Sequence, residues 1–298
     1  MIPRFDAAAF GVQVGTMGTA LDGGMNSPGL SPYGHRVVAS RAVQGNTDIW
    51  ILDDAGASRF TFDAALDRFP IWSPDGSRVA FDSNRAGHRQ LYQKRTDGAG
   101  NEELLLASAQ DTGAMSWSPD GRFLLYRSQD PVTLSDLWVL PLEGDQTPRV
   151  FLKTQYDERT GVFSPDGKWV AYQSNASGPL EIYVRPFSGS ASASNAQWQI
   201  STAGGIQPRW SRDGKELYYL APDSTLMAAP IAVQNGALRP GTSLALFRTR
   251  IAGGGTNSNT KQQYDVAADG RFLISVTSDE ATATAITLLQ NWHPETAK

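Results

Sequence analysis

The chain of 298 residues contains no cysteine and only three histidines. Without cysteine it has no disulfide, no thiolate metal site and no cysteine nucleophile, whereas the cellular compartment stays open. The histidines, His35, His88 and His293, fall at different positions of the repeats described below, so we expect no metal site and no cofactor.

Charge and hydropathy are also unexceptional. The 26 basic and 30 acidic residues give a net charge of −4, and a nucleic-acid partner, which needs a basic face, is not expected. No apolar run reaches the ~18 residues of a membrane segment. The first 18 residues lack the apolar core of a signal peptide. A periplasmic location therefore remains as compatible with the sequence as a cytoplasmic one.

What the chain has is a repeated phrase, an aromatic or apolar residue followed by Ser-(Pro/Arg)-Asp-Gly and a short apolar run. Close copies end at Gly76, Gly121, Gly167 and Gly214, a looser copy at Gly270, and a degenerate copy at Gly34. The spacings of these glycines are 42, 45, 46, 47 and 56 residues. A period of this length indicates a repeat architecture.

Each repeat unit is predicted to hold four strands. In the second unit these are 69–73, 78–82, 90–94 and 103–106. Asp-Gly between two alternating apolar runs favours a hairpin, and no segment shows sustained helical periodicity. Four strands per ~45 residues, repeated six times, predict an all-β, six-bladed β-propeller of four-stranded antiparallel blades. We expect the aromatic residue before each turn to pack between neighbouring blades.

The whole chain, 1–298, is predicted to be a single domain with repeats at about 30–69, 70–114, 115–160, 161–206, 207–262 and 263–298. The last repeat needs an N-terminal strand from within 4–17. Both Arg4–Ala7 and Val12–Met17 qualify, so either Arg4–Ala7 lies outside the sheet or the chain is the tail of a longer protein. Tyr33 replaces aspartate in the first turn, where we expect a different turn or local strain.

The phrase and the strands after it resemble the TolB-type, WD40-like β-propeller repeat, from Leu30 to about Trp292. Segments such as 45–50, 136–145 and 289–292 further resemble the C-terminal propeller of large bacterial membrane Ser/Thr protein kinases. This resemblance implies an extracytoplasmic sensor or protein-interaction module. The chain has no Gly-rich ATP loop, His-Arg-Asp or Asp-Phe-Gly motif, so kinase activity is not implied.

No other catalytic motif is evident. The chain lacks a Gly-x-Ser-x-Gly elbow. The repeated aspartates are better explained as turn residues that bond their own backbone than as a catalytic set. These are Asp75, Asp120, Asp166, Asp213 and Asp269. From these absences we expect that the chain is not an enzyme.

A binding site is expected at the channel mouth, in the loops that enter the inner strands and join the second and third strands. Tyr156 to Arg159 form the densest mixed-charge cluster there, and arginine suits capture of a carboxylate or phosphate. The alternative is a solvated charged loop. The expected mouth residues are Asp67, Arg68, Asn84, Arg85, His88, Tyr156, Asp157, Glu158, Arg159, Gln207, Arg209, Gln262 and Gln263.

Three functions are compatible with these patterns. The first is a non-catalytic, monomeric binding module for a protein or peptide partner, outside the cytoplasm by family resemblance. The second is a small propeller lyase or hydrolase that acts on sugars or lactones through acidic residues such as Asp157 and Glu158. The third is a piece of a sensor kinase with only a structural role of its own.

Overall fold

A computed structural model describes residues 13–16, 25–189, 196–251, 254–255, 262–277 and 284–290, with the backbone alone at 13–16, 277 and 284–290. Every regular element in these ranges is a β-strand, and the strands form six antiparallel sheets. None of the described residues forms a helix long and apolar enough to cross a membrane. For the described residues the expectation of an all-β architecture of antiparallel four-stranded sheets is confirmed, except that the fifth sheet has five strands.

The first three sheets follow one another along the chain. The first contains β2 (Met25–Leu30), β3 (Val37–Val43), β4 (Asn46–Asp53) and β5 (Gly56–Arg59). The second contains β6 (Asp67–Trp72), β7 (Arg78–Ala86), β8 (His88–Arg95) and β9 (Glu103–Leu106). The third contains β10 (Thr112–Trp117), β11 (Phe123–Asp130), β12 (Leu134–Pro141) and β13 (Arg149–Leu152).

The remaining sheets vary this plan. The fourth contains β14 (Glu158–Phe163), β15 (Trp169–Ser174), β16 (Glu181–Pro186) and β17 (Trp198–Gln199). The fifth contains β18 (Ile206–Trp210), β19 (Glu216–Leu220), β20 (Thr225–Gln234), β21 (Ala237–Pro240) and β22 (Leu244–Arg248). The sixth contains β23 (Tyr264–Val266), β24 (Phe272–Thr277), β25 (Thr284–Gln290) and β1 (Gln13–Thr16). Long β20 pairs with β21 at one end and β22 at the other, an extra hairpin that the sequence reading missed.

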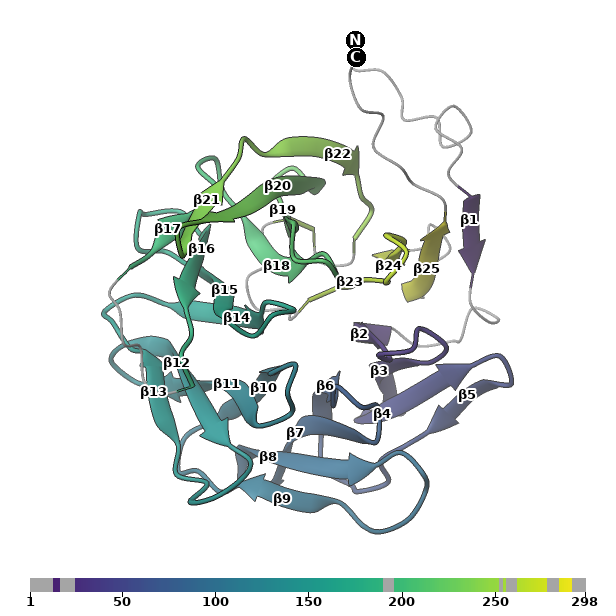
Figure 1. The fold of residues 1–298 in the computed structure, drawn as a ribbon. Coiled ribbons are helices and arrows are strands. Elements are labelled where there is room, and N and C mark those ends of the chain that lie inside the picture. Colours follow the sequence, from purple (N-terminus) through teal and green to yellow (C-terminus); the bar gives the residue numbers. More distant parts are fainter. Residues whose placement is uncertain are drawn as a thin grey trace.

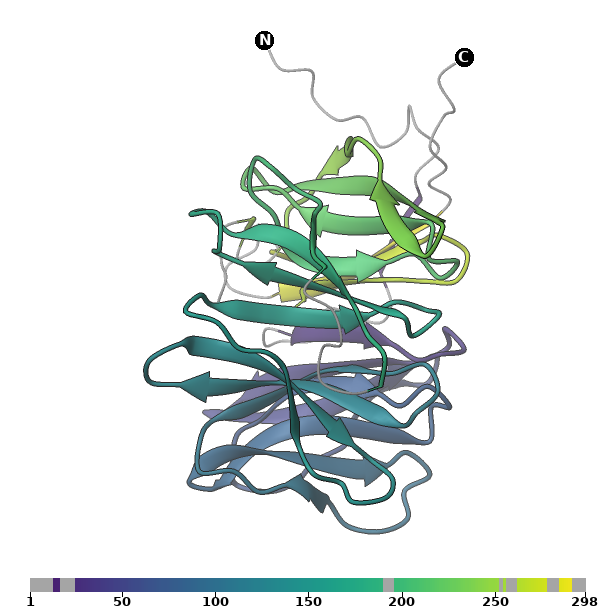
Figure 2. The ribbon, with the colours of Figure 1, turned by 60° about the vertical axis from the view of Figure 1, so that its left-hand side comes forward.

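The sheets stand around a common axis, each with its first strand innermost (Figure 1). A view turned by 60° shows successive sheets packed against one another (Figure 2). In the sixth sheet β1 pairs with β25 as the outermost strand. Arg4–Ala7 lies outside the described residues. Two hydrogen bonds join the first and last sheets, from Leu30 N to Asp265 Oδ2 at 2.8 Å and from Ser275 Oγ to Met25 O at 3.0 Å.

Each turn between the first two strands of a sheet is held by its own residues. In the second sheet Gly76 N donates to Ser73 O at 2.9 Å, and Ser77 N donates to Asp75 Oδ1 at 3.0 Å. The positive φ falls on the glycine, +68° at Gly76, as expected for this turn. The interpretation of the repeated aspartates as turn residues is confirmed.

The first turn corrects the expectation made for Tyr33. Gly34 N donates to Ser31 O at 2.9 Å, the same bond as in the other turns, and Gly34 has φ +75°. Tyr33 does not have positive φ, and its side chain is 71% exposed. The expectation of a different or strained turn was wrong, because the glycine alone takes the left-handed conformation.

The aromatic residue before the turn packs between neighbouring sheets, as expected. Trp72 of the second sheet lies in one cluster with Val38 and Ile49 of the first, and its Nε1 donates to Gly29 O at 3.0 Å. Trp210 of the fifth sheet makes the same kind of bond to Val162 O of the fourth, at 3.4 Å. These contacts make each sheet depend on its neighbour for its core.

Irregularities recur near the start of the inner strands. Four residues have positive φ, each three positions before the aromatic or apolar residue that opens the repeated phrase. They are Ser27 (+56°), Phe69 (+57°), Thr160 (+49°) and Gln207 (+58°). In all four strands the register with the next strand shifts at this place. Such bulges re-aim side chains and are frequent beside functional sites.

Candidate binding site at the channel mouth

The inner strands run from one end of the central channel to the other. We call the end where these strands begin the mouth, and the end with the Ser-Pro-Asp-Gly turns the turn end. A cavity of about 470 Å³ at the turn end is lined by residues of all six sheets, among them Trp72, Trp117 and Trp210. Arg209 and Asp265, 3.6 Å apart, belong to this cavity. Arg209 therefore lies toward the turn end, not at the mouth as expected, because it follows the bulge of β18.

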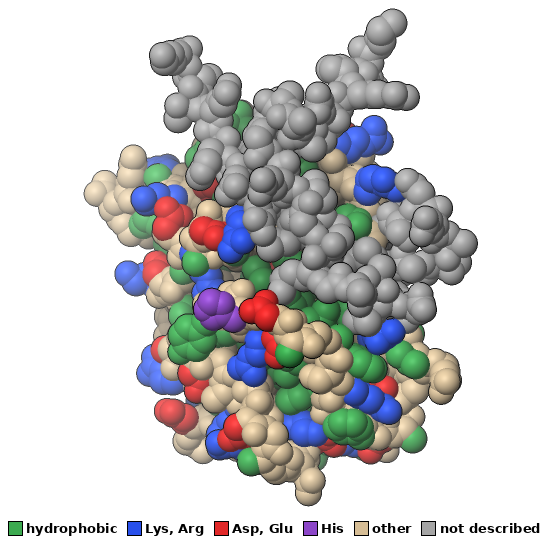
Figure 3. All heavy atoms as spheres, turned by 90° about the vertical axis from the view of Figure 1, so that its right-hand side faces the viewer, with side chains coloured by type: hydrophobic (Ala, Val, Ile, Leu, Met, Phe, Trp, Pro, Cys, Tyr) green, Lys and Arg blue, Asp and Glu red, His purple; other side chains and the backbone are tan. Residues whose placement is uncertain are grey.

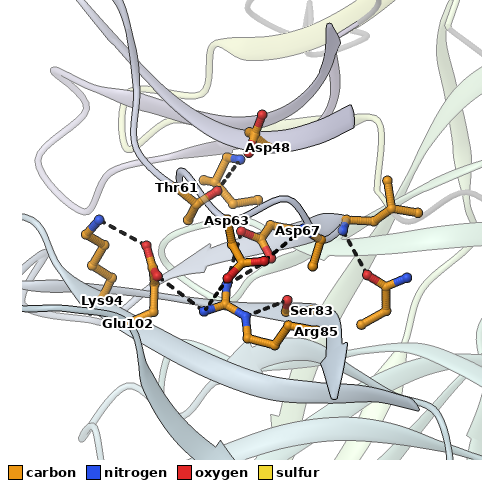
Figure 4. A network of polar contacts seen from close by, with 12 residues as sticks. Asp48, Thr61, Asp63, Asp67, Ser83, Arg85, Lys94 and Glu102 are labelled. Atoms are coloured by element: carbon orange, nitrogen blue, oxygen red, sulfur yellow. Dashed lines mark hydrogen bonds and ion pairs between the residues drawn. The ribbon is translucent and has the colours of Figure 1, made fainter. Parts of the chain in front are cut away.

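Two expected mouth residues form an ion pair inside the protein. Arg85 Nη2 lies 3.2 and 3.3 Å from the two carboxylate oxygens of Asp67, which is fully buried. Arg85 Nη1 also lies 3.2 Å from Glu102 Oε2, and Nε donates to Ser83 Oγ (Figure 4). Burial raises the pKa of Asp67 even though its hydrogen bonds and Arg85 act in the other direction.

Asn84 belongs to the same structural region, since its Oδ1 accepts the Leu66 N–H at 2.8 Å. Lys94 Nζ extends the network by lying 3.1 Å from Glu102 Oε1 (Figure 4). Asp67, Asn84 and Arg85 thus tie the loop that enters the second sheet to that sheet. Their partners are protein groups, so these three residues support the mouth.

Gln207 and Gln263 are also buried and hydrogen-bonded within the protein. Both are 1% exposed, and Gln263 N donates to Gln207 Oε1 at 2.7 Å. Gln207 N in turn donates to Gln173 Oε1, and Gln207 O accepts the Tyr264 hydroxyl at 2.8 Å. This chain of bonds joins the fourth, fifth and sixth sheets beside the mouth.

Arg68 and Arg159 occupy equivalent positions, four residues before Trp72 and Phe163. Each faces its cross-strand partner, Asp82 for Arg68 and Gln173 for Arg159. Arg159 Nε donates to Asp157 Oδ1 at 2.7 Å. Burial lowers the pKa of Arg68; the nearby charge of Arg89 lowers it further, whereas Asp82 and Asp111 oppose the shift.

The corresponding position of the third sheet reveals a residue that sequence reasoning missed. It is occupied by Gly113, and its cross-strand partner is Arg127. A Cβ at Gly113 would lie 3.1 Å from Arg127 Nε, so the absent side chain makes room for the guanidinium. Burial lowers the pKa of Arg127, and the charges of Arg159 and Arg89 act in the same direction. The signal for Arg127 in the sequence is Gly113, which stands where the neighbouring repeats have Arg68 and Arg159.

The rest of the expected mouth set differs in exposure. His88 is mostly exposed, with Nδ1 3.8 Å from Asp111 Oδ1. Tyr156 is partly exposed, and its N–H donates to Thr154 Oγ1 at 3.0 Å. Glu158 is 1% exposed and accepts a hydrogen bond from the Thr154 hydroxyl. Burial raises the pKa of Glu158 to about 7, with Asp136 and Asp157 adding to the effect.

Other surfaces offer less. The described part of the face seen in Figure 3 mixes acidic and basic side chains. Among the described residues no three His, Cys, Asp or Glu side chains are grouped so that they could hold a metal ion.

Comparison with known proteins agrees with this architecture. A family model described as the TolB beta propeller domain matches residues 13–135. The structure is similar to that of a putative TolB from Agrobacterium tumefaciens, with a TM-score of 0.64, 18% identity, and coverage of 87% of this chain and 94% of the other. Residues 13–135 thus match the TolB beta propeller domain, and the fold of the described residues is similar to that of TolB-like propellers. The narrower resemblance to kinase propellers stays a prediction.

Two curated relatives of this chain are much longer proteins. The uncharacterized peptidase YuxL of Bacillus subtilis is 26% identical over 181 residues, which are 46% of this chain and 27% of the relative. The tricorn protease homolog 1 of Streptomyces coelicolor is 30% identical over 117 residues, 38% of this chain and 11% of the relative. The matches thus span about a quarter and a tenth of those proteins.

Two further structures bear on the expectation that the chain is not an enzyme. A gluconolactonase from Xanthomonas campestris has a TM-score of 0.62 at 12% identity, covering 93% of this chain and 88% of the other. An oligogalacturonate lyase in complex with manganese has a TM-score of 0.60 at 12% identity, covering 94% and 90%. The expectation that the chain is not an enzyme is contradicted, because proteins named as enzymes share this fold over most of both chains.

Proposed function

We propose that the six sheets are the six blades of a TolB-type propeller that binds a peptide segment of a protein partner at the mouth. The observation that carries this proposal is that Arg68, Arg127 and Arg159 belong to cross-strand pairs at equivalent positions of three adjacent sheets, where the charge of Arg89 also acts on Arg68 and Arg127. Bringing partly buried guanidinium groups together is costly, and binding sites are where such arrangements are found.

The scaffold supports this assignment. Bulged inner strands present the mouth residues, and the Asp67–Arg85 network holds the loop behind them. A site on rigid strands keeps its geometry before the partner arrives and so reduces the entropy lost on binding. A role outside the cytoplasm, alone or as a sensor in a longer protein, fits the family resemblance.

A random peptide display library selected on the full chain tests the proposal. Binders should bind the Arg159→Ser variant at least tenfold more weakly than the wild type. The matched control is Arg212→Ser, which removes an arginine at the turn end, where Arg212 donates to Pro32 O at 3.3 Å. The mouth would be refuted as the binding site if the selected peptides lost affinity for Arg212→Ser instead. It would also be refuted if no peptide lost affinity for Arg159→Ser.

A second candidate is catalysis at the same mouth, by a lyase or hydrolase acting on sugars or lactones. It is favoured by the lactonase and the lyase that share the fold over at least 88% of both chains. Glu158, with its pKa of about 7, is suited to proton transfer near neutral pH. Turnover on a panel of lactones and acidic oligosaccharides, lost in Glu158→Gln, would support this candidate, whereas a blank panel would count against it.

A further inference from the structure

One layer of cross-strand pairs surrounds the mouth. At the same position of successive sheets, Arg68 faces Asp82, Gly113 faces Arg127 and Arg159 faces Gln173. Because cross-strand partners lie on one face of a sheet, these pairs place their side chains at one level of the channel wall. The layer therefore brings three guanidinium groups from adjacent sheets to one level.

The arginines of this layer and the nearby Arg89 differ in their partners. Arg159 bonds to Asp157, and Arg89 Nη2 lies 3.5 Å from Asp111 Oδ2. Within the described residues neither Arg68 nor Arg127 has an ion-pair or hydrogen-bond partner, and Arg68 Nε is buried without an acceptor. Two guanidinium groups with about ten N–H donors between them thus have donors available for a ligand.

Buried amides beside the arginines add further donors. Gln173 is fully buried; its Oε1 accepts the Thr160 hydroxyl and the Gln207 N–H, while its Nε2 has no acceptor in the described protein. Gln262, at the equivalent position of the sixth sheet, is 1% exposed, and neither its Nε2 nor its Oε1 has a partner there. An unsatisfied buried amide is costly, and a ligand acceptor would remove that cost.

The charge balance limits what the ligand can be. Arg89, Arg159, Asp82, Asp111 and Asp157 are the charges that act on Arg68 and Arg127. With Arg68 and Arg127 themselves they make four arginines and three carboxylates, when Glu158, whose pKa is about 7, is counted as protonated. The difference is a single positive charge. One carboxylate matches both this excess and the forked geometry of a guanidinium, whereas a phosphate dianion would exceed it.

From this geometry we infer that the mouth captures a carboxylate of its ligand between Arg68 and Arg127, with Gln173 Nε2 as an additional donor. The inference rests on the proposed function and names the chemical group that the partner presents. An acidic side chain or a free C-terminus of a peptide supplies such a group.

Arginine Nε–H resonances of the full-length, ¹⁵N-labelled protein test the inference directly. Propionate, added at constant ionic strength, should shift the Arg68 and Arg127 signals saturably, and more strongly than chloride does. Inorganic phosphate at the same concentration should bind more weakly. Non-saturating shifts, or tighter binding of phosphate, would overturn the carboxylate assignment.

Variants complete the test. Arg127→Gln should raise the propionate dissociation constant at least tenfold. Arg127→Lys should raise it less, because lysine keeps the positive charge but lacks the two parallel N–H donors of a guanidinium. Arg95→Gln, at an exposed pair with Asp97, is the matched control and should leave binding unchanged. An equal effect of Arg127→Gln and Arg95→Gln would refute the site. Arg127→Lys keeps the test valid if Arg127→Gln folds poorly.

The two proposals fail separately. Peptides that depend on Arg159 but carry no needed carboxylate and ignore Arg127→Gln would contradict the carboxylate inference and leave the binding function standing. Saturable propionate shifts without any mouth-dependent peptide would support the anion site and contradict the peptide-binding function.

Discussion

Arg85 and Asp67 form a two-contact ion pair, at 3.2 and 3.3 Å, between the second strand of the second sheet and the start of its first strand. The carboxylate has no exposed surface, so Arg85, Ser83 and Thr61 take the place of water around it. This pair is next in sequence to Arg68, which we propose faces the mouth. Of two adjacent residues, Asp67 therefore stabilises the fold through its ion pair, whereas Arg68 is assigned to ligand binding.

Replacing Arg85 with methionine should leave Asp67 buried without its cation. We expect a loss of about 3–5 kcal/mol in the free energy of unfolding, measured by urea denaturation. Asp67→Asn combined with Arg85→Met should recover part of that loss, because the buried charge is gone. Arg95→Met, at an exposed pair, should change stability little. A similar small effect of Arg85→Met would contradict the structural role.

Truncating Trp72 to alanine should remove part of the core between the first two sheets. A large aromatic residue that is 8% exposed typically contributes about 3–5 kcal/mol, so the thermal midpoint should fall by many degrees. Tyr33→Ala, which removes a side chain that is 71% exposed, is the control and should change the midpoint little. Equal effects of the two substitutions would argue against packing between sheets.

Gly161 and Gly29 give a matched pair of glycines in inner strands. A Cβ at Gly161 would lie 2.6 Å from Leu125 Cδ2 of the neighbouring sheet, whereas a Cβ at Gly29 would have its nearest contact at 3.4 Å. Gly161→Ala should therefore cost about 1–3 kcal/mol by overpacking, measured by urea denaturation. Gly29→Ala should have a smaller effect, and the opposite order would show that the sheets are more loosely packed here.

Glu158 should make stability depend on pH. Its pKa is raised from 4.5 to about 7, so between these values the folded protein keeps a proton that the unfolded chain has lost. Stability contributed by this group is present below about pH 4.5 and is lost as the pH rises to 7, by about 3 kcal/mol at most. Urea midpoints of the wild type and Glu158→Gln across this range should diverge, with the variant less sensitive. Parallel curves would contradict the raised pKa.

The turns show how much local sequence can predict. Ser73, Asp75 and Gly76 satisfy each other within five residues, so the turn follows from the phrase itself. The four strands of each sheet were predictable for the same reason, because each strand is recognised from the alternation of apolar residues within a short segment. The hairpin of β21 was missed because the long β20 changes its partner midway along its length.

The candidate site was predictable only in outline. Arg68 and Arg159 were named because loops before inner strands meet at one end of a propeller. Asp67 and Arg85 lie in the same loops, but the sequence does not indicate that they form a buried ion pair with each other rather than being exposed to a ligand. Arg209 was misplaced because a bulge shifts its strand register.

By itself, then, the sequence determined the repeat, its turns and the aromatic residues between sheets, since each depends on residues close along the chain or on hydrophobic periodicity. Tertiary structure alone decided which charges are neutralised inside the protein and which face the channel. Arg127 illustrates the reason: it lies 14 residues from Gly113 in sequence, and only sheet pairing brings that glycine under its guanidinium, while neighbouring sheets supply Asp82 and Arg159.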